Sequence, residues 1–241
     1  MRRLDLSFDN PAMNLALDEA LLVDAENARR GDDDEVIRFW RFQRTAVVMG
    51  RGTRMHDEVD LDFCKASFIP VLRRCSGGAS IVAGIDCLMY SVVISMHTRP
   101  ELRSVDNAHR LVIGHLADAV SKQRDDVRVQ GICDLTLGDK KFSGNSLRVV
   151  KNHLLYHGTI LLGVDPDLVQ RCLRTPPRQP DYRTGRSHDD FVTHIDLDPV
   201  RLCDDLAATY DAGEIMDPWP DATMRSLYEE KYGRDDWHHR H

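Results

Sequence analysis

The sequence predicts an α+β fold in which helices flank a mixed or antiparallel central sheet. β-type runs follow one another through the middle of the chain and the last third is more helical, so the two classes are segregated rather than strictly alternating. The 241 residues, 42% of them hydrophobic, are enough to bury a substantial core. We expect one main domain over residues 1–195 and a helical extension over 196–241 packed on it, because about 46 residues are few for an independent core.

The first hundred residues are expected to form a strand, then a helix, and then mainly strands. Asn10 as N-cap and Pro11 at the first helical position predict a helix that ends near residue 28. A short helix is expected over about 58–66, between strands that apolar and β-branched runs predict. The expected strands cover residues 1–7, 36–42, 45–50, 69–74, 79–83 and 87–96.

The rest of the chain is expected to form a long helix, a set of hairpins and further helices. Apolar residues at helical spacing predict the long helix over 104–122. Successive strands follow up to residue 163, with tight turns at Gly138 and near Asn152. A proline-rich loop is expected over 175–188. The helices expected around and after this loop cover residues 166–174, 200–213 and 224–232.

Charge and cysteine content exclude several classes of protein. The formal net charge is −7 and the basic residues are scattered among acids, so a nucleic-acid groove has little support. Acidic residues interrupt the apolar positions of the N-terminus, which excludes a signal-peptide core or a membrane-spanning helix there. The six cysteines include no C-x-x-C pair and are expected to be reduced thiols. We therefore expect a cytoplasmic protein whose partners are neither nucleic acids nor membranes.

The stretch RRCSGGAS, residues 73–80, combines fixed positive charge with small residues directly after an apolar run. Gly77 and Gly78 allow backbone angles that are closed to other residues, so consecutive amides can turn toward an anion. Arg73 and Arg74 add forked donors suited to phosphate or carboxylate. One interpretation is an oxyanion site, and the other is a glycine-rich hairpin with solvated arginines. The chain contains neither a P-loop nor a dinucleotide-binding glycine motif.

A second candidate is DKKFSG, residues 139–144, with the sequence HGT on the strand that returns beside it. A strand lysine beside small residues can reach across a cleft and stabilise negative charge in a transition state. Lys140 and Lys141 face opposite sides of a strand, so only one of them can point inward. Periodicity does not decide which one, and a basic hairpin tip is the alternative interpretation.

Several motifs in a fixed order resemble the biotin/lipoate A/B protein ligase family, and within it the lipoate-protein ligase A branch. The resemblance spans roughly residues 5–195. The family pattern of a basic or polar residue, Lys, a hydrophobic residue and Ser-Gly selects Lys141 over Lys140. The motifs are NLALDEALL (14–22), VVMGRG (47–52), RRCSGGASIV (73–82), DLTLGDKKFSGNS (134–146) and YHGTILL (156–162).

The resemblance implies a class II biotin/lipoate ligase-like catalytic domain and a two-step reaction. A lipoate or octanoate carboxylate would attack the α-phosphate of ATP, and a lysine of a lipoyl carrier domain would then take the acyl group from the acyl-adenylate. Lys141 would be the catalytic residue, and Mg²⁺ would accompany the triphosphate. The implied substrate and ATP contacts are Arg73, Arg74, Ser76, Gly77, Gly78, Ala79, Ser80, Ile81, Val82, Asp134, Ser143, Gly144 and His157.

Several roles stay open under this resemblance. Asp134 is the nearest family-placed carboxylate for magnesium, with a turn-stabilising role as its alternative, and the metal site is otherwise unknown. Trp40 and Tyr90 are candidate walls of the acyl slot, and ordinary core packing is the alternative for both. His157 could bind substrate, polarise it or close a core hydrogen bond, and we do not assign it as a general base.

The chain also departs from the family pattern in its candidate site. Ala79 replaces the usual third glycine, Met89 stands where asparagine is frequent, and Leu147 lies in a changed segment after the Ser-Gly pair. These departures leave the lipoate versus octanoate preference and the efficiency open, and a weakly active carrier-binding homologue is one alternative. An octanoyltransferase is another, but it needs a nucleophilic cysteine, and residues 181–195 contain none. The residues that follow GRG at 50–52 do not fit the pattern of a biotin ligase, so we rank that alternative low.

The implied protein partner is a lipoyl carrier. The family suggests an E2 subunit, a glycine-cleavage H protein or a dedicated lipoate-binding protein. We expect no full C-terminal accessory domain, so the protein would act alone, use a separate accessory subunit or accept a preformed acyl-adenylate.

Overall fold

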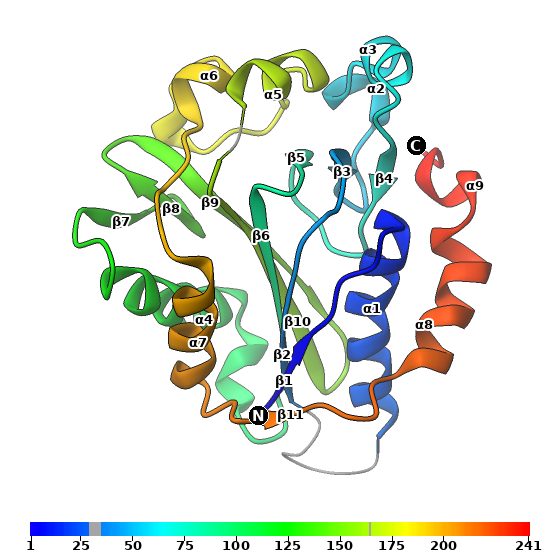
Figure 1. The fold of residues 1–241 in the computed structure, drawn as a ribbon, viewed down its shortest axis with the longest axis vertical. Coiled ribbons are helices and arrows are strands. Elements are labelled where there is room, and N and C mark those ends of the chain that lie inside the picture. The colour runs from blue at the N-terminus through cyan, green and yellow to red at the C-terminus, as the bar shows by residue number, and fades with distance from the viewer. Residues whose placement is uncertain (29–34, 164) are drawn as a thin grey trace.

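The computed structural model describes residues 1–28, 35–163 and 165–241, which form a large sheet, a small sheet and the helices around them (Figure 1). Within these residues the large sheet has eight strands, and the pairs at its N-terminal edge are parallel whereas the others are antiparallel. The predicted α+β class with a mixed sheet is therefore confirmed. In spatial order its strands are β11 (Glu214–Ile215), β1 (Arg2–Asp5), β2 (Val36–Trp40), β6 (Cys87–Ser95), β10 (His153–Leu161), β9 (Lys140–Val149), β8 (Asp134–Leu137) and β7 (Val127–Gln130).

Helices cover both faces of the large sheet. On one face, α1 (Pro11–Asn27) contacts β6 and β10, and the π-helical turn η4 (Tyr228–Tyr232) and α8 (Asp221–Leu227) pack against α1. On the other face, α4 (Val105–Ser121) contacts β7 and β8 and packs against α7 (Pro199–Thr209) (Figure 1). Each layer therefore buries one face of the same sheet.

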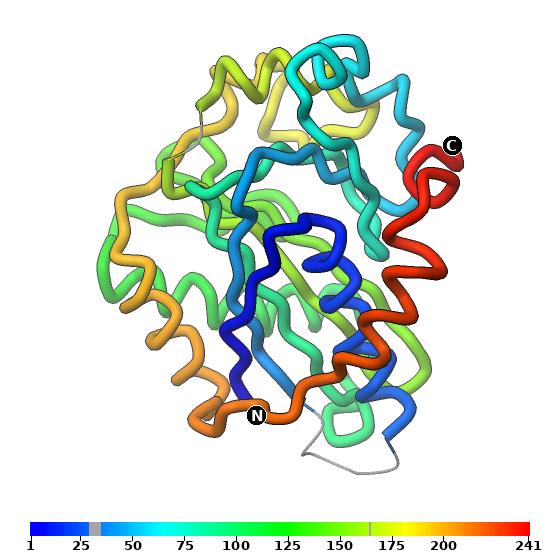
Figure 2. Tube along the Cα trace, turned by 45° about the vertical axis from the view of Figure 1, so that its right-hand side comes forward, coloured from blue at the N-terminus to red at the C-terminus, as the bar shows by residue number. Residues whose placement is uncertain are grey.

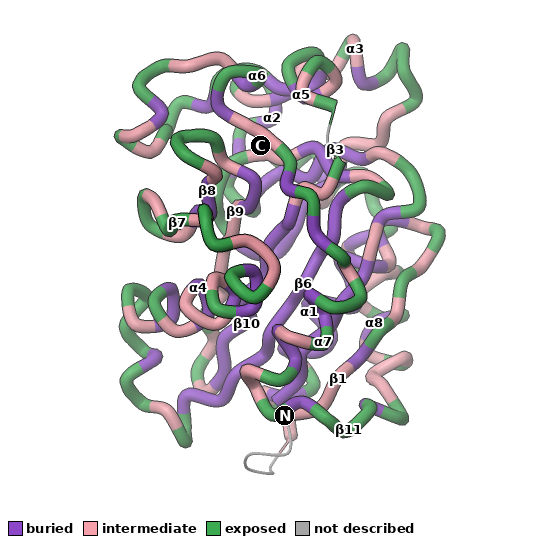
Figure 3. Tube along the Cα trace, turned by 60° about the vertical axis from the view of Figure 1, so that its left-hand side comes forward, coloured by how far each residue is buried: buried purple, intermediate pink, exposed green. Residues whose placement is uncertain are grey.

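The central strands supply two separate cores because their side chains alternate. Every residue of β6 is buried, and β10 is buried over nearly its whole length (Figure 3). Leu88 and Tyr90 of β6 belong to the core under α4, whereas Met89 and Val93 belong to the core under α1. This alternation fixes which β10 side chains can face a ligand on the α1 side.

A small sheet and several short helices close one end of the molecule. β3 (Ala46–Met49) pairs in parallel with β4 (Val71–Arg73) and antiparallel with β5 (Ile81–Ala83). The loop that follows β4 reaches the large sheet, where the Ser76 hydroxyl lies 2.5 Å from His157 Nε2 of β10. The short helices of this end are α2 (Met55–Glu58), α3 (Leu61–Ala66), α5 (Pro166–Cys172) and α6 (His188–Phe191), with the 3₁₀ turn η3 (Asp181–Arg183) before α6.

Two sequence expectations for this end differ from the structure. The single helix expected over 58–66 is two helices, because Asp60 stays extended and caps α3 by accepting a hydrogen bond from Phe63 N (2.9 Å). The loop expected over 175–188 contains η3 and leads into α6, whose N-cap is the Ser187 hydroxyl. Long-range contacts, rather than local propensity, hold both short segments.

The C-terminal residues wrap around the main body. β11 pairs with β1, and the chain continues through α8 and η4 to α9 (Asp235–His238), which contacts β4 (Figure 2). The 3₁₀ turn η2 (Pro100–Arg103) precedes α4. Within the residues that the structure describes, no helix combines the length and the apolar character that crossing a bilayer requires. The division of the chain at residue 195 stays a prediction.

Candidate functional site

A cavity of about 190 Å³ opens where the α1 face of the large sheet meets the small sheet and the α5–α6 segment. Its apolar wall comes from α1, β2, β6 and β10, and includes Leu15, Trp40, Met89 and Leu161. Its polar wall comes from the loop between β4 and β5 and from β9. The cavity therefore joins an apolar slot to a polar, cation-bearing mouth, which suits an amphipathic ligand.

Lys141 is part of the polar wall. Its ammonium Nζ lies 2.7 Å from Asp134 Oδ1, and a Cβ placed on Gly144 would lie 2.8 Å from that nitrogen. Lys140 faces the other way and is exposed, with Nζ 3.4 Å from the carbonyl oxygen of Asp189. A single inward lysine thus lies over a glycine whose missing side chain leaves room for the amine.

Arg74 organises the glycine loop between β4 and β5. Its guanidinium donates to the carbonyl oxygens of Val48 (3.1 Å), Gly77 and Ala79 (3.0 Å). Burial lowers the pKa of Arg74 to about 10, so the group stays cationic at neutral pH. Carbonyl and N–H point in opposite directions across a trans peptide, so the amides that follow Gly77 and Ala79 face away from Arg74.

One of these amides already binds an anion. The Ser80 N–H donates to Glu58 Oε2 at 2.7 Å. Gly78 has φ +87°, which other residues adopt with difficulty, and a Cβ on Gly50 would lie only 2.0 Å from its carbonyl oxygen. Close packing of two glycines therefore shapes a loop with amides directed away from the guanidinium, as an oxyanion site requires.

Arg73 does not face the cavity, which corrects the expectation that it binds substrate or ATP. Its guanidinium is fully buried and donates to the carbonyl oxygens of Gly50 (2.9 Å), Thr53 (2.8 Å) and His238 (2.9 Å). Successive residues at the end of β4 point to opposite sides, so Arg73 turns away when Arg74 turns toward the loop. Arg73 anchors the turn after β3 and α9.

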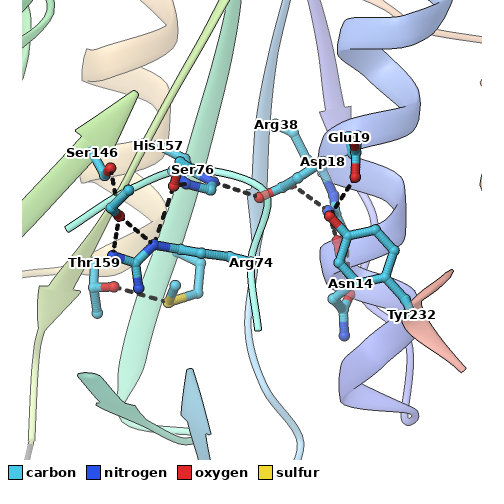
Figure 4. Close-up of polar contacts among 12 residues, drawn as sticks. Asn14, Asp18, Glu19, Arg38, Arg74, Ser76, Ser146, His157, Thr159 and Tyr232 are labelled. Atoms are coloured by element: carbon cyan, nitrogen blue, oxygen red, sulfur yellow. Dashed lines mark hydrogen bonds and ion pairs between the residues drawn. The ribbon is translucent and has the colours of Figure 1, made fainter. Parts of the chain in front are cut away.

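His157 links the loop to α1 through a buried chain of hydrogen bonds (Figure 4). Its Nδ1 lies 3.1 Å from Asp18 Oδ2, and because a carboxylate only accepts, Nδ1–H is the donor. The Ser76 hydroxyl lies 2.5 Å from Nε2 and also accepts from Arg74 Nε (3.1 Å). Arg38 Nη1 donates to Asp18 Oδ1 at 2.6 Å. His157 therefore closes a core hydrogen bond, and it also lines the cavity.

Asp18 is a buried anion in this chain. Burial favours the neutral acid, but the charge of Arg38 and the hydrogen bond from His157 outweigh it, so the pKa of Asp18 is lowered. The carboxylate stays ionised and fixes the orientation of His157.

The remaining predicted residues divide between the cavity wall and its support. The side chain of Ser143 is fully buried and accepts a hydrogen bond from Asn145 Nδ2 (3.2 Å), so Ser143 supports the wall from behind. Tyr90 packs in the core under α4 and donates to Asn145 Oδ1 (2.6 Å), but it also borders the cavity. Ser76 and Gly77 border a second, shallow cleft. Those that line the cavity are Trp40, Arg74, Gly78, Ala79, Ser80, Ile81, Val82, Tyr90, Lys141, Gly144 and His157.

Asp134 is a partner of Lys141 in this structure, and its role as a magnesium ligand stays a prediction. Its other oxygen, Oδ2, accepts a hydrogen bond from the Tyr182 hydroxyl (2.8 Å). Over residues 1–28, 35–163 and 165–241 there is no cluster of three or more His, Cys, Asp or Glu side chains suited to a metal ion. The described side chains therefore form no preassembled metal cluster, and we derive no catalytic step through a metal.

No cysteine lines the cavity in the described part of the chain. Burial raises the pKa of the Cys75 thiol to about 11, and it does the same for Cys133. Cys64, whose pKa is lowered by a hydrogen bond from Cys172, is buried in the core under the small sheet. The cavity thus lacks the thiolate that a thioester mechanism needs.

Several cavity residues were not singled out from the sequence. Asp18 is the one that the sequence could have indicated most easily. A carboxylate within the apolar run NLALDEALL must be buried if the helix packs on a sheet. Arg183 and His188 lie in the segment expected to be a loop, and no periodic signal marks them. Their presence in the wall depends on long-range packing.

We predict that Arg73→Met lowers the free energy of unfolding by about 3 kcal/mol, because several buried carbonyl oxygens lose a charged donor. Urea denaturation followed by circular dichroism measures the change. Arg51→Met is the matched control: Arg51 is exposed, and its variant should stay within about 0.5 kcal/mol of the wild type. Equal stability of the two variants would contradict the anchoring role of Arg73.

A pH dependence follows from His188, which is buried beside Arg183. Burial and the charge of Arg183 lower the pKa of His188 from 6.5 to about 4, despite the opposing charge of Asp189. As the pH falls below 6.5, the unfolded chain takes up this proton before the native one, so native stability present above pH 6.5 is lost down through about pH 4. We expect a loss of roughly 2 kcal/mol from this group.

Urea titrations at pH 7 and pH 4.5 measure that loss, and His188→Gln serves as the comparison. The variant lacks the titrating group, so its stability should fall less than that of the wild type between the two pH values. An equal loss of stability between pH 7 and pH 4.5 in both proteins would rule out a depressed pKa at His188.

Comparison with known proteins identifies the family. The profile of the lipoyl protein ligase A/B catalytic domain matches residues 10–198. Lipoate-protein ligase A subunit 1 of Thermoplasma acidophilum is 25% identical, with 95% of this chain and 92% of that protein covered. Lipoate–protein ligase 1 of Staphylococcus aureus is 27% identical over 70% of this chain. The matched region covers 48% of the S. aureus protein. Octanoyltransferase LipM of Exiguobacterium is 25% identical over 85% of this chain and 81% of that protein.

Solved structures have the same fold. A T. acidophilum structure, described as a bi-partite lipoate protein ligase and its E2 lipoyl domain, superposes with a TM-score of 0.82 at 23% identity, covering 99% of this chain and 95% of that chain. A lipoate-protein ligase A bound with ATP gives a TM-score of 0.80 at 22% identity, covering 99% and 98%. The predicted family is confirmed: the chain belongs to the lipoyl protein ligase A/B catalytic domain family.

Proposed function

We propose that the protein is an ATP-dependent lipoate-protein ligase, which activates lipoate or octanoate as acyl-AMP and transfers the acyl group to a lysine of a lipoyl carrier domain. The observation that carries this proposal is the position of Lys141. Its amine lies in the wall of a cavity that has an apolar slot on one side and the amide-bearing loop 78–82 on the other. One cation is thus available to two anionic groups that must approach each other.

The first half-reaction joins a carboxylate to a phosphate. A carboxylate oxygen attacks the α-phosphorus of ATP, a new P–O bond forms, and pyrophosphate leaves with the electron pair of the broken bond. Lys141 and the loop amides stabilise the negative charge that gathers on the phosphoryl oxygens. The apolar wall around Leu15, Trp40 and Met89 holds the acyl chain and excludes water from the mixed anhydride.

The second half-reaction transfers the acyl group. The neutral amine of a carrier lysine attacks the acyl carbon, an amide forms, and AMP leaves with the electron pair of the acyl–oxygen bond. Loss of the amine proton completes the step. Lys141 again faces the group that gains charge, since AMP departs as a phosphate anion.

The cysteines favour the ligase over an octanoyltransferase. Transferase relatives such as LipM share the family, but among the described residues the cavity holds no thiol, and the thiols of Cys75 and Cys133 have raised pKa values. A raised pKa lowers the thiolate fraction at neutral pH. The six free thiols fit a reducing compartment, so we place the reaction in the cytoplasm.

The proposed partners are a lipoyl carrier and an accessory subunit. The T. acidophilum relative is a subunit of a bi-partite ligase studied with its E2 lipoyl domain, and we extend that arrangement to this chain. An E2 subunit, a glycine-cleavage H protein or a lipoate-binding protein would serve as the carrier. Magnesium enters as the counter-ion of the triphosphate, because Mg²⁺ keeps mainly water and phosphate ligands in such sites.

Two variants test the position of Lys141. Lys141→Ala should lower acyl-AMP formation at least about 100-fold, because the charge that stabilises the transition state is lost. Gly144→Ala keeps the lysine but places a methyl group 2.7 Å from its Cε, so the amine must move and we expect a loss of about tenfold. Mass spectrometry of acyl-AMP after incubation with ATP, magnesium and octanoate measures both effects.

The matched control is Lys140→Ala, which removes the neighbouring exposed amine and should leave the rate within about twofold of the wild type. Adenylation that survives in Lys141→Ala would contradict the proposal. An acyl-enzyme that forms from octanoyl carrier protein without ATP, and that hydroxylamine cleaves, would assign the protein to the transferases instead.

A further inference from the structure

The cavity wall contains a buried cation that lacks an anionic partner. Arg183 in η3 is 4% exposed, and its Nε donates to the carbonyl oxygen of Arg186 at 2.9 Å. Its Nη2 has no hydrogen-bond partner within the described residues. Burial and the charge of Arg186 lower the pKa of Arg183, and only the Tyr182 hydroxyl opposes them. Burying a guanidinium without a carboxylate is unfavourable, and a bound anion would offset this cost.

Unsatisfied polar atoms concentrate around the same cavity. Among the described residues, ten buried side-chain atoms lack a partner, and four of them belong to cavity-lining residues. These are Trp40 Nε1, Ser80 Oγ, Arg183 Nη2 and His188 Nδ1. Buried polar groups in native proteins nearly always have partners, so this concentration indicates that a polar ligand completes the site.

Hydrogen bonds on both sides of Arg183 connect its segment to β8 and β9. The residue before it, Tyr182, donates its hydroxyl to Asp134, whose other oxygen is 2.7 Å from Lys141 Nζ. Further along the segment, Thr193 N donates to the carbonyl oxygen of Lys141 at 2.8 Å. Hydrogen bonds therefore link the segment that carries Arg183 to β8 and β9, and Arg183 and Lys141 line one cavity.

We propose that Arg183 is a phosphate-binding residue, whose free Nη2 donates to a phosphoryl oxygen of the nucleotide in the cavity. This inference rests on the proposed function and adds a nucleotide contact outside the glycine loop and Lys141. A guanidinium suits phosphate because its forked donors match two oxygens. Phosphate is favoured over the acid's carboxylate, because a nucleotide brings several anionic oxygens whereas the single carboxylate must also reach Lys141.

Arg183→Gln tests the inference, with Arg171→Gln as the matched control. Arg171 lies in α5 of the same wall, but it is exposed and does not line the cavity. Titration calorimetry with AMP, ATP and octanoate separately gives the three affinities of each protein. We expect Arg183→Gln to weaken both nucleotides about 10- to 100-fold, with octanoate unchanged within twofold and Arg171→Gln close to the wild type throughout. Arg183→Lys, which keeps the charge but not the fork, should recover part of the nucleotide affinity.

Thermal unfolding of the free protein separates ligand binding from a structural role. Because Arg183→Gln removes an unmatched buried charge, the melting temperature should stay equal or rise. A lowered melting temperature together with equal losses for nucleotide and octanoate would overturn the inference in favour of a structural arginine. A loss confined to octanoate would assign the group to the carboxylate and overturn it as well.

The test distinguishes this inference from the proposed function. Wild-type protein that binds nucleotide, with an unchanged affinity in Arg183→Gln, would overturn the role of Arg183 and leave the ligase assignment standing. Wild-type protein that binds neither AMP nor ATP would overturn both.

Discussion

The candidate site depends on two adjacent guanidinium groups that take up main-chain carbonyl oxygens on opposite sides of β4. Arg74 donates hydrogen bonds to carbonyl oxygens of β3 and of the glycine loop. Arg73 donates to carbonyl oxygens of the turn after β3 and of α9. Each buried cation is solvated by peptide dipoles instead of water, which makes its burial tolerable. In return, each guanidinium fixes the direction of the peptide planes around it. The loop amides face away from Arg74 because their carbonyl counterparts face it, and the Ser80 amide already holds the Glu58 carboxylate.

The sheet contributes the second constraint, because strand alternation sorts polar groups to the α1 face. His157 and Thr159 of β10 and Met89 of β6 lie on that face, whereas Tyr90 and Tyr156 pack under α4. The buried carboxylate of α1 then meets His157 where the strand delivers it. An ionised Asp18 is stable there because Arg38 lies on the same face of β2. The apolar slot and its polar end are thus properties of one face of one sheet.

The sequence supports prediction where a local rule decides the outcome. The helix at Pro11, the hairpin at Gly138 and the inward lysine two residues before Ser-Gly follow from capping, turn chemistry and a family motif. The structure contains the helix and the hairpin and places Lys141 in the cavity wall. Arg73 could not be assigned in the same way. Its charge suggests a ligand contact, and only the position at which β4 ends decides which of two adjacent arginines turns inward.

The helix expected over 166–174 is present as α5, but η3 and α6 in the segment after it were not predicted, for a related reason. Proline-rich residues give no periodic signal, and η3 and α6 are each too short to be stable alone. Contacts between residues distant in the sequence hold them, among them Tyr182 with Asp134 and Thr193 with Lys141. Sequence reasoning that treats segments separately cannot detect such pairs.

The Lys141–Asp134 pair connects β9 and β8 to the turn η3, which borders the cavity. In the free protein, Asp134 is nearly buried and shares its two oxygens between the ammonium of Lys141 and the hydroxyl of Tyr182. In the proposed reaction, an entering phosphate would compete with that carboxylate for the amine. The exchange would need only a small movement of the flexible Lys141 side chain over Gly144. Asp134 therefore contacts Lys141 through one oxygen and, through the other, holds Tyr182 of the neighbouring turn η3.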